Sequence, residues 1–321
     1  MRVVPASLVC SAVFLYAISG VASAATILFR DEMTDAATWG VNIGGSGDSA
    51  YTFNYDYSLF GIPEAPNTAV GDLTTRGVKL EANQNNPGAA EYFTLYPTGQ
   101  NFTGSYRLRF DAWQNFEVGG IGTTEFLGGG IGYDNLTADI ASGAQATATG
   151  DGGSSNDWRA FKSPPQFFIP DADMAAGTHQ GSDPYYAGFL PAVPAAQGQA
   201  GTSVAGSPGF QWITWEIAVV VDLVTISIEK PDSSRLVIVQ YDRTDTSDGS
   251  AGVSTDGNIS LFYADFFSSV SSNPALAFGI IDNVEVALIP EPSSLLLLGF
   301  GVAGICALRR TRPRSGRPST D

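Results

Sequence analysis

Apolar and polar residues alternate with a period of two along several stretches of this chain. From Tyr106 to Ala112 the apolar side chains fall on one parity and the charged ones on the other. The segment from Tyr51 to Tyr57 repeats the alternation with aromatic residues, and Val78 to Ala82 repeats it again. Successive side chains of a strand point to opposite faces, so each stretch predicts a strand with one buried face.

The longest β-rich block lies in the last third of the chain. It predicts strands from Trp212 to Val221, from Leu223 to Glu229 and from Leu236 to Tyr241, the last two joined by a Pro-Asp-Ser-Ser turn at 231–234. Two later strands are expected at 259–262 and 278–286. In the last one, Asp282 has the parity of Ile280 and Val284 and therefore points inward. A buried carboxyl group must be hydrogen-bonded or metal-bound, or lie at a bulge.

No stretch of a dozen residues combines helical periodicity with capping residues, so the pattern predicts an all-β, antiparallel sandwich. Two regions look like exceptions. Residues 136–210 are rich in Ala, Gly, Ser and Pro and predict a long loop, either functional or mobile. The glycines at 119–122 and 128–132 lack the lysine and the following helix of a phosphate-binding loop, so they predict β turns or bulges.

The first 24 residues have the layout of a secretory signal peptide. Arg2 precedes a mainly apolar stretch from about Leu8 to Val21, and the small residues Ala22, Ser23 and Ala24 follow. This order marks export, with cleavage expected after Ala24. A buried N-terminal helix is the alternative, but a protein core does not require this order.

A second set of signals lies at the C-terminal end. Pro290, Glu291 and Pro292 precede two serines and an apolar run of 14 residues, 295–308. The run is short against the roughly 20 residues that cross a bilayer, but the serines and snorkelling arginines extend its reach. The positive-inside rule places the arginines that follow in the cytoplasm and the preceding domain outside: Arg309, Arg310, Arg312, Arg314 and Arg317.

These residues resemble the PEP-CTERM sorting signal of Gram-negative bacteria over 289–312. The resemblance implies that Pro290, Glu291 and Pro292 are recognised, that the apolar run is a transmembrane helix, and that the arginines act as a cytoplasmic stop. It also implies processing by an exosortase-type enzyme, with an inner-membrane intermediate before the protein reaches the cell surface or is secreted. Residues 313–321 form a cytoplasmic tail longer than the pattern requires. A permanent anchor that is never cut is the alternative.

The domain between these ends, 25–288, is long enough for one large β domain. Its last part, 210–288, resembles the concanavalin A-like lectin and glucanase jelly roll that is often joined to such tails. The residues that carry this resemblance are tryptophans before a strand pair, the segment 264–270 and the segment 278–286. The expected fold is therefore a jelly-roll β-sandwich.

Charge narrows the range of partners. Arg2 and five C-terminal arginines lie outside the domain, which leaves 10 of the 16 basic residues against 30 of the 32 acidic ones, a net charge near −20. Such a surface repels nucleic acid and anionic lipid and attracts cations. Both cysteines, Cys10 and Cys306, lie in the terminal segments, so we expect the domain to fold without a disulfide.

Catalytic signatures are lacking in the sequence. The Glu-x-Asp-x-x-Glu spacing of laminarinase-type glycanases does not occur, and the single histidine, His179, is expected to be a solvated loop residue. We therefore expect a protein that is not an enzyme. Sugar binding would use aromatic side chains beside Asn and Asp acceptors, and the candidates lie in the long loop: Asn156, Asp157, Trp158, Tyr185 and Tyr186. The alternative is that these aromatic residues cover the edge of the sandwich.

Calcium is the metal that the composition favours, because aspartates collect in Gly- and Ser-rich turns. The candidate ligands Asp242, Asp245 and Asp248 are spaced by three, whereas an EF-hand loop spaces its ligands by two. Solvated turn aspartates that bind no cofactor are the alternative. Three functions stay open: a carbohydrate-binding module for exopolysaccharide, a structural matrix component without a ligand, and a glycoside hydrolase.

Overall fold

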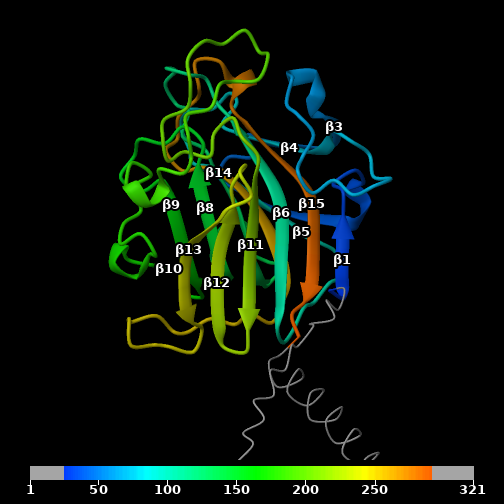
Figure 1. The fold of residues 1–321 in the computed structure, drawn as a ribbon, viewed down its shortest axis with the longest axis vertical. Coiled ribbons are helices and arrows are strands. Elements are labelled where there is room, and N and C mark those ends of the chain that lie inside the picture. The colour runs from blue at the N-terminus through cyan, green and yellow to red at the C-terminus, as the bar shows by residue number, and fades with distance from the viewer. Residues whose placement is uncertain (1–24, 291–321) are drawn as a thin grey trace, which may run out of the picture.

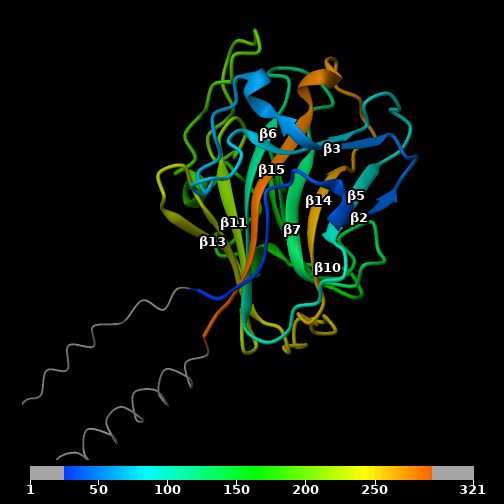
Figure 2. The same cartoon turned by 90° about the vertical axis from the view of Figure 1, so that its right-hand side faces the viewer.

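The computed structural model describes residues 25–290, and they form two antiparallel sheets packed face to face (Figures 1 and 2). The expected all-β jelly-roll sandwich is confirmed. The first sheet has eight strands: β13 (Arg235–Asp242), β12 (Leu223–Glu229), β11 (Ile213–Val220), β6 (Tyr106–Asn115), β15 (Phe278–Leu288), β4 (Arg76–Ala82) and β3 (Ser49–Asp56) in this order, with β1 (Ile27–Asp31) paired to β15.

The second sheet has seven strands: β10 (Phe167–Phe168), β9 (Trp158–Ser163), β8 (Gly143–Thr149), β7 (Phe126–Tyr133), β14 (Asn258–Asp265), β5 (Glu91–Pro97) and β2 (Trp39–Gly44). The helical segments are short 3-10 turns: η1 (Ala36–Thr38), η2 (Tyr57–Phe60), η3 (Asp171–Asp173), η4 (Pro184–Tyr186) and η5 (Pro274–Leu276). Within residues 25–290, no helix is long and apolar enough to span a membrane.

The predicted alternation sets the core between the sheets. In β6, Leu108 and Phe110 are fully buried, while Arg107 and Arg109 lie on the outer face and are partly exposed. Phe110 stacks on Trp215 of β11, with ring centroids 6.5 Å apart. The remaining predicted strands are also present, including the hairpin of β12 and β13.

The predicted loop at 136–210 is the main error, because it contains β8, β9 and β10. In β8 the inward side chains are alanines, Ala144, Ala146 and Ala148, all of them fully buried. Alanine is depleted in strands, and its small side chain gives a weak hydrophobic signal. The alternation was present, but in residues too small to reveal it.

The prediction of turns or bulges for the glycines at 128–132 is mostly wrong, since all four belong to the central strand β7. A Cβ atom on Gly128 would lie 1.9 Å from the carbonyl oxygen of Ala146 in the neighbouring strand. Only Gly132, with a φ of 76°, lies near a register shift opposite Asn258 and matches the prediction of a bulge.

Both ends of the described chain lie side by side, at the same end of the strands of the first sheet (Figure 2). The amide of Leu288 donates to the carbonyl of Thr26 at 2.9 Å, and the amide of Ile289 donates to that of Ser105 at 3.0 Å. Pro290 follows directly and is exposed. The predicted signal peptide (1–24), Glu291, Pro292, the apolar run and Arg309, Arg310 and Arg312 lie outside the described residues.

Candidate functional site

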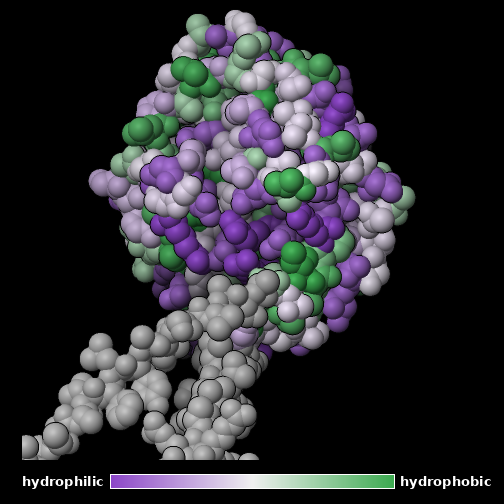
Figure 3. All heavy atoms as spheres, turned by 45° about the vertical axis from the view of Figure 1, so that its right-hand side comes forward, coloured by the Kyte–Doolittle hydropathy of each residue, from purple (hydrophilic) through white to green (hydrophobic). Residues whose placement is uncertain are grey.

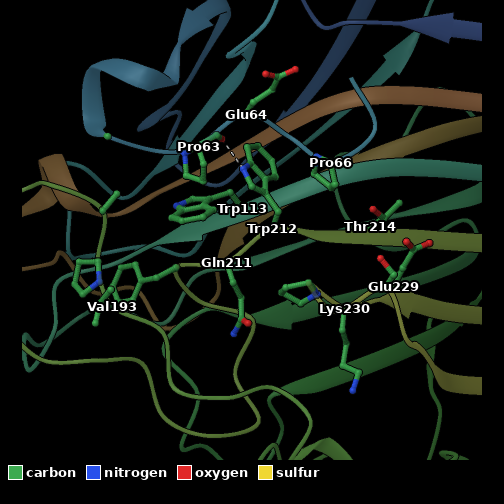
Figure 4. A pocket seen from close by; sticks show the side chains of 16 residues that line it. Pro63, Glu64, Pro66, Trp113, Val193, Gln211, Trp212, Thr214, Glu229 and Lys230 are labelled. Carbon is green, nitrogen blue, oxygen red and sulfur yellow. Dashed lines mark hydrogen bonds between the residues drawn. The ribbon is translucent and has the colours of Figure 1, made fainter. Parts of the chain in front are cut away.

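A pocket of about 450 Å³ lies on the outer face of the first sheet (Figure 4), near the end of the sandwich opposite the termini, where β6 ends and β15 begins (Figure 1). Five segments form it: the end of β6, the approach to β11, the loop after η2, the loop at 193–195 and the β12–β13 turn. Its lining includes Pro63, Glu64, Pro66, Trp113, Val193, Phe210, Gln211, Trp212, Thr214, Glu229 and Lys230.

Two tryptophans form the floor of this pocket. Trp113 and Trp212 meet edge to face, with ring centroids 5.7 Å apart, and Trp212 packs in the same way on Tyr57 at 5.3 Å. The indole N–H of Trp212 donates to the carbonyl of Pro63 at 2.7 Å, whereas the indole N–H of Trp113 is buried without a partner in the described structure. Only 4% of Trp113 and 7% of Trp212 is exposed, so the floor is firmly held.

Buried acids fasten one wall of the pocket to the sheet. Asp111 of β6 is fully buried and accepts hydrogen bonds from the amide of Asn67 at 3.0 Å and from its side chain at 2.6 Å. Thr214 and Asn283 donate to the same carboxyl group at 2.6 and 2.9 Å. Burial raises the pKa of Asp111, and these donors oppose the rise. The loop that carries Pro63, Glu64 and Pro66 is thus tied to β6 through Asn67.

Asp282 lies beside Asp111 on the neighbouring strand β15. Its side chain accepts from the hydroxyl of Tyr57 at 2.9 Å and from the amide of Asn283 at 2.7 Å. Burial raises its pKa to about 7 against the effect of these hydrogen bonds, and the nearby Asp111 carboxyl contributes to the rise. The prediction that Asp282 points inward is wrong, because Asp282 pairs with outward-facing Asp111 and lies on the outer face of the sheet. It is still buried and hydrogen-bonded, as a buried carboxyl group must be, and the register shifts between Asp282 and Glu285.

The rim of the pocket combines apolar and polar groups of both charges. Glu64 is exposed, and Gln211 donates to the carbonyl of Ser207 at 2.9 Å. Glu229 is held by Arg109 at 3.0 Å. The pocket therefore offers an apolar floor with amide and carboxylate groups around it, and Figure 4 shows Glu229 and Lys230 at one side and Glu64 at another. Such a lining suits an uncharged ligand that has both apolar faces and hydroxyl groups.

The sugar-binding residues expected from the sequence lie elsewhere, and the two largest are in the core. Trp158 and Tyr186 are fully buried and stack on each other, with centroids 5.3 Å apart and an angle of 10° between the rings. They cannot offer a face to a sugar, so their assignment to a ligand surface is corrected. Strand β9 places Trp158 between the sheets, where a large aromatic residue fills the core.

The neighbouring candidates also serve the fold. Asp157 is buried and accepts from the hydroxyl of Thr149 at 3.1 Å and from the amide of Gly181 at 2.9 Å. Tyr185 is half-buried and donates to the carbonyl of Val237 at 2.7 Å. Asn156 is partly exposed at the turn before β9, away from the pocket. These residues close the edge of the sandwich, which was the alternative interpretation.

The structure also bears on the expectations for His179 and for the candidate calcium ligands. His179 is not solvated: it is 2% exposed and stacks on Phe168, with centroids 4.5 Å apart. Each candidate calcium ligand caps its own turn: Asp242 accepts from the amide of Thr244 and Asp245 from that of Ser247, both at 2.8 Å, and Asp248 pairs with Lys162. Among residues 25–290 no group of three or more acidic, His or Cys side chains could hold a metal. The three candidate aspartates are therefore not gathered into one group in this part of the chain.

The sequence did carry a signal for Trp113 that was missed. Trp113 has the parity of Arg107, Arg109 and Asp111, the outward residues of β6. A tryptophan on the polar parity of a strand indicates an aromatic residue on the outer face, where it must be covered by a loop or by a ligand.

Comparison with known proteins gives one sequence match. Residues 288–310 match the PEP-CTERM protein-sorting motif. The chain carries a sorting signal. The resemblance drawn from Pro290, Glu291 and Pro292 is thereby confirmed, and it marks an exported protein. No curated protein sequence matches the chain significantly.

Several solved structures resemble the sandwich. The exoplasmic/lumenal domain of VIP36, bound to Ca²⁺ and Man3GlcNAc, is 7% identical over 81% of this chain and 88% of its own, with a TM-score of 0.42. Peanut lectin is 7% identical over 75% and 98%, with a TM-score of 0.38. The carbohydrate-binding module CBM66 from Bacillus subtilis is 9% identical over 64% and 89%, with a TM-score of 0.33. The strand order described above remains the basis of the fold assignment.

Proposed function

We propose that this protein is an exported surface or extracellular-matrix protein whose domain binds exopolysaccharide, without catalysis, in the pocket over Trp113 and Trp212. The observation that carries the proposal is an apolar, aromatic floor surrounded by amide and carboxylate groups on the outer face of the sheet. Pyranose rings pair with such sites because their C–H faces are apolar and their hydroxyl groups need hydrogen-bond partners.

Charge indicates which polysaccharides fit. The domain has a net charge near −20, counted as 10 basic against 30 acidic residues. Polyanionic chains would be repelled over the whole surface. The pocket itself has Glu64 and Glu229 against Lys230, so it does not offset that repulsion. A neutral exopolysaccharide is the ligand class that agrees with both facts.

The position of the pocket agrees with display on a cell surface. Tyr106 at the start of β6 pairs with Leu288, next to the sorting motif, and Trp113 lies seven residues further along the same strand. At about 3.3 Å per residue, the pocket floor lies roughly 23 Å from the edge where the chain leaves the domain. A ligand in the pocket would therefore not meet the membrane that holds the tail.

The terminal segments complete the proposal. A signal peptide at 1–24 exports the chain, the apolar run at 295–308 holds it in the inner membrane, and an exosortase-type enzyme processes it at Pro290, Glu291 and Pro292. The match at 288–310 supports this route. The protein then reaches the cell surface or the matrix.

A glycoside hydrolase is the alternative that the fold leaves open, and the buried acids argue against it. Asp111 and Asp282 are the adjacent carboxyl pair of the outer face, but they are 0% and 1% exposed and are occupied by neighbouring donors. A glycosidase needs its two carboxyl groups open to a cleft on either side of the scissile bond. We therefore assign this pair to holding the pocket wall.

Retention on an immobilised neutral polysaccharide tests the proposal with the full chain in detergent. Glu64→Ala combined with Gln211→Ala removes two polar groups from the rim without touching the core, so retention should fall several-fold while the thermal transition stays in place. The matched control is Asp173→Ala, which changes an exposed acid in η3. Equal retention of all three proteins would place binding elsewhere, and no retention of the parent protein would favour a structural role without a ligand.

A further inference from the structure

Exposed hydrophobic residues gather at the edge where the chain leaves the domain. Five residues with large apolar side chains are between 39% and 56% exposed there, and we call them the basal rim: Ile27, Leu28, Val221, Leu223 and Leu288. Figure 3 shows hydrophobic surface at the lower edge of the domain, beside strongly hydrophilic surface.

Strand pairing brings these five residues together although they lie far apart in the sequence. Leu223 pairs with Val220 at the β11–β12 turn, Val219 pairs with Tyr106, and Tyr106 pairs with Leu288. Ile27 pairs with Ala287 on the other side of β15. The rim thus follows the ends of five neighbouring strands, about 4.8 Å apart, across roughly 19 Å of the sheet.

Ser105 connects the two halves of the rim. Its hydroxyl accepts from the amide of Val221 at 3.1 Å, and its carbonyl accepts from the amide of Ile289 at 3.0 Å. Val221 itself has a φ of 58°, at a hairpin position where Asn or Gly is the usual residue. An exposed valine here is disfavoured both by its backbone and by water, so folding alone does not explain it.

The length of chain beyond the domain identifies what the rim faces. Ile289 is hydrogen-bonded to the sheet, and the apolar run begins at Leu295. The five steps from Pro290 to Leu295 span at most about 18 Å when fully extended. A bilayer has about 6 Å of polar headgroup region on each side of its hydrocarbon core. The rim is therefore kept within roughly 12 Å of the headgroup surface for as long as the tail stays inserted.

We infer that the basal rim is a membrane-docking surface, which lays Ile27, Leu28, Val221, Leu223 and Leu288 into the headgroup region of the bilayer before the tail is processed. The inference rests on the membrane-inserted tail of the proposed function. Docking is apolar: beside the rim, Asp222 pairs with Arg243 at 3.0 Å, and the domain as a whole is acidic. Salt should therefore strengthen docking to anionic lipid by screening the repulsion.

The experiment uses the full chain in phosphatidylcholine nanodiscs and exploits the lack of cysteine between residues 25 and 290. With Cys10→Ser and Cys306→Ser in place, Val221→Cys carries an environment-sensitive fluorophore. Ile121→Cys is the matched control, because Ile121 is 75% exposed in the loop between β6 and β7 at the opposite end. Lipid-borne quencher should quench the label at position 221 at least several-fold more strongly than the label at position 121.

A third sample keeps Cys306, which lies in the apolar run, as the only labelled cysteine. Quenching at 306 together with equal, weak quenching at 221 and 121 would overturn the docking of the rim and leave the inserted tail supported. Loss of quenching at 306 would overturn both the inserted tail and the docking that depends on it. A fluorophore at position 221 that stays shielded from water in detergent without lipid, together with a doubled particle mass, would show a second copy on the rim. That result would also overturn the inference.

Discussion

Replacing Asp282 by Asn should stabilise the protein at alkaline pH and leave it nearly unchanged at acid pH. Asp282 is 1% exposed, and burial raises its pKa to about 7. In an unfolded chain the same carboxyl group titrates at about 3.9. Between these two values the folded protein holds a proton that the unfolded chain has released. The contribution of Asp282 is therefore fully present below about pH 4 and is lost as the pH rises through about 7.

The size of the effect follows from the same pKa values. Integrating the proton difference from pH 5 to pH 8 gives a loss of about 2.5 kcal/mol for the ionised acid, while the amide in Asp282→Asn has no charge to bury. The amide can still accept from Asn283 through its oxygen and contact Tyr57 through its nitrogen, as the protonated acid does. In a domain of this size, this part of the gain corresponds to a melting-temperature advantage that grows by roughly 5 to 10 °C between pH 5 and pH 8.

Urea unfolding of the parent and the variant at several pH values measures the difference directly. The variant should gain on the parent from pH 5 to about pH 7 and level off by pH 8, and Asp173→Asn, at an exposed site in η3, should show no such trend. Parallel stability curves for the parent protein and Asp282→Asn would refute the reasoning, because Asp282 would then titrate alike in both states.

Three further predictions concern the wall, the core and one ion pair. Asn67→Ala removes the side-chain hydrogen bonds to buried Asp111 and to Thr214 but keeps the backbone one, so it should cost about 1 to 3 kcal/mol in urea unfolding and weaken polysaccharide retention. Trp158→Ala should cost about 3 to 5 kcal/mol, measured by the same method, because the side chain is fully buried. Burial would raise the pKa of Asp248, but Lys162 and Ser250 lower it to about 2. The parent should therefore lose its stability advantage over Asp248→Asn as the pH falls from 4 to 2, which thermal melts at several pH values measure.

The strands with large alternating side chains were predictable from the sequence, and those built from small residues were not. The alternation in β6, β11 and β15 contains Leu, Ile, Trp and Phe, whose size makes the period visible. Strands β7 and β8 use Gly and Ala at the same positions, because they pack closely against neighbouring strands. Their composition resembles that of a loop until the neighbours are known.

The candidate site shows the same limit. Asp282 could be predicted as a buried, bonded acid from the apolar residues around it, but its face could not, because the register shift between Asp282 and Glu285 breaks the parity that links it to Val284. The pocket depends on segments that are distant in the sequence, such as Pro63 beside Trp212. The tryptophan chosen from the sequence, Trp158, stood beside Asn and Asp as sugar-binding tryptophans do, but the fold uses it as core. Local composition could not distinguish these two roles.

We propose that the pocket over Trp113 and Trp212 binds a neutral polysaccharide. A glycan-array screen of the full chain in detergent, run beside the double variant Glu64→Ala and Gln211→Ala, measures this binding. We expect binding to one class of neutral glycan, unaffected by a calcium chelator and lost in the variant. Binding that is equal in both proteins, or an array without signal from a well-folded sample, would contradict it.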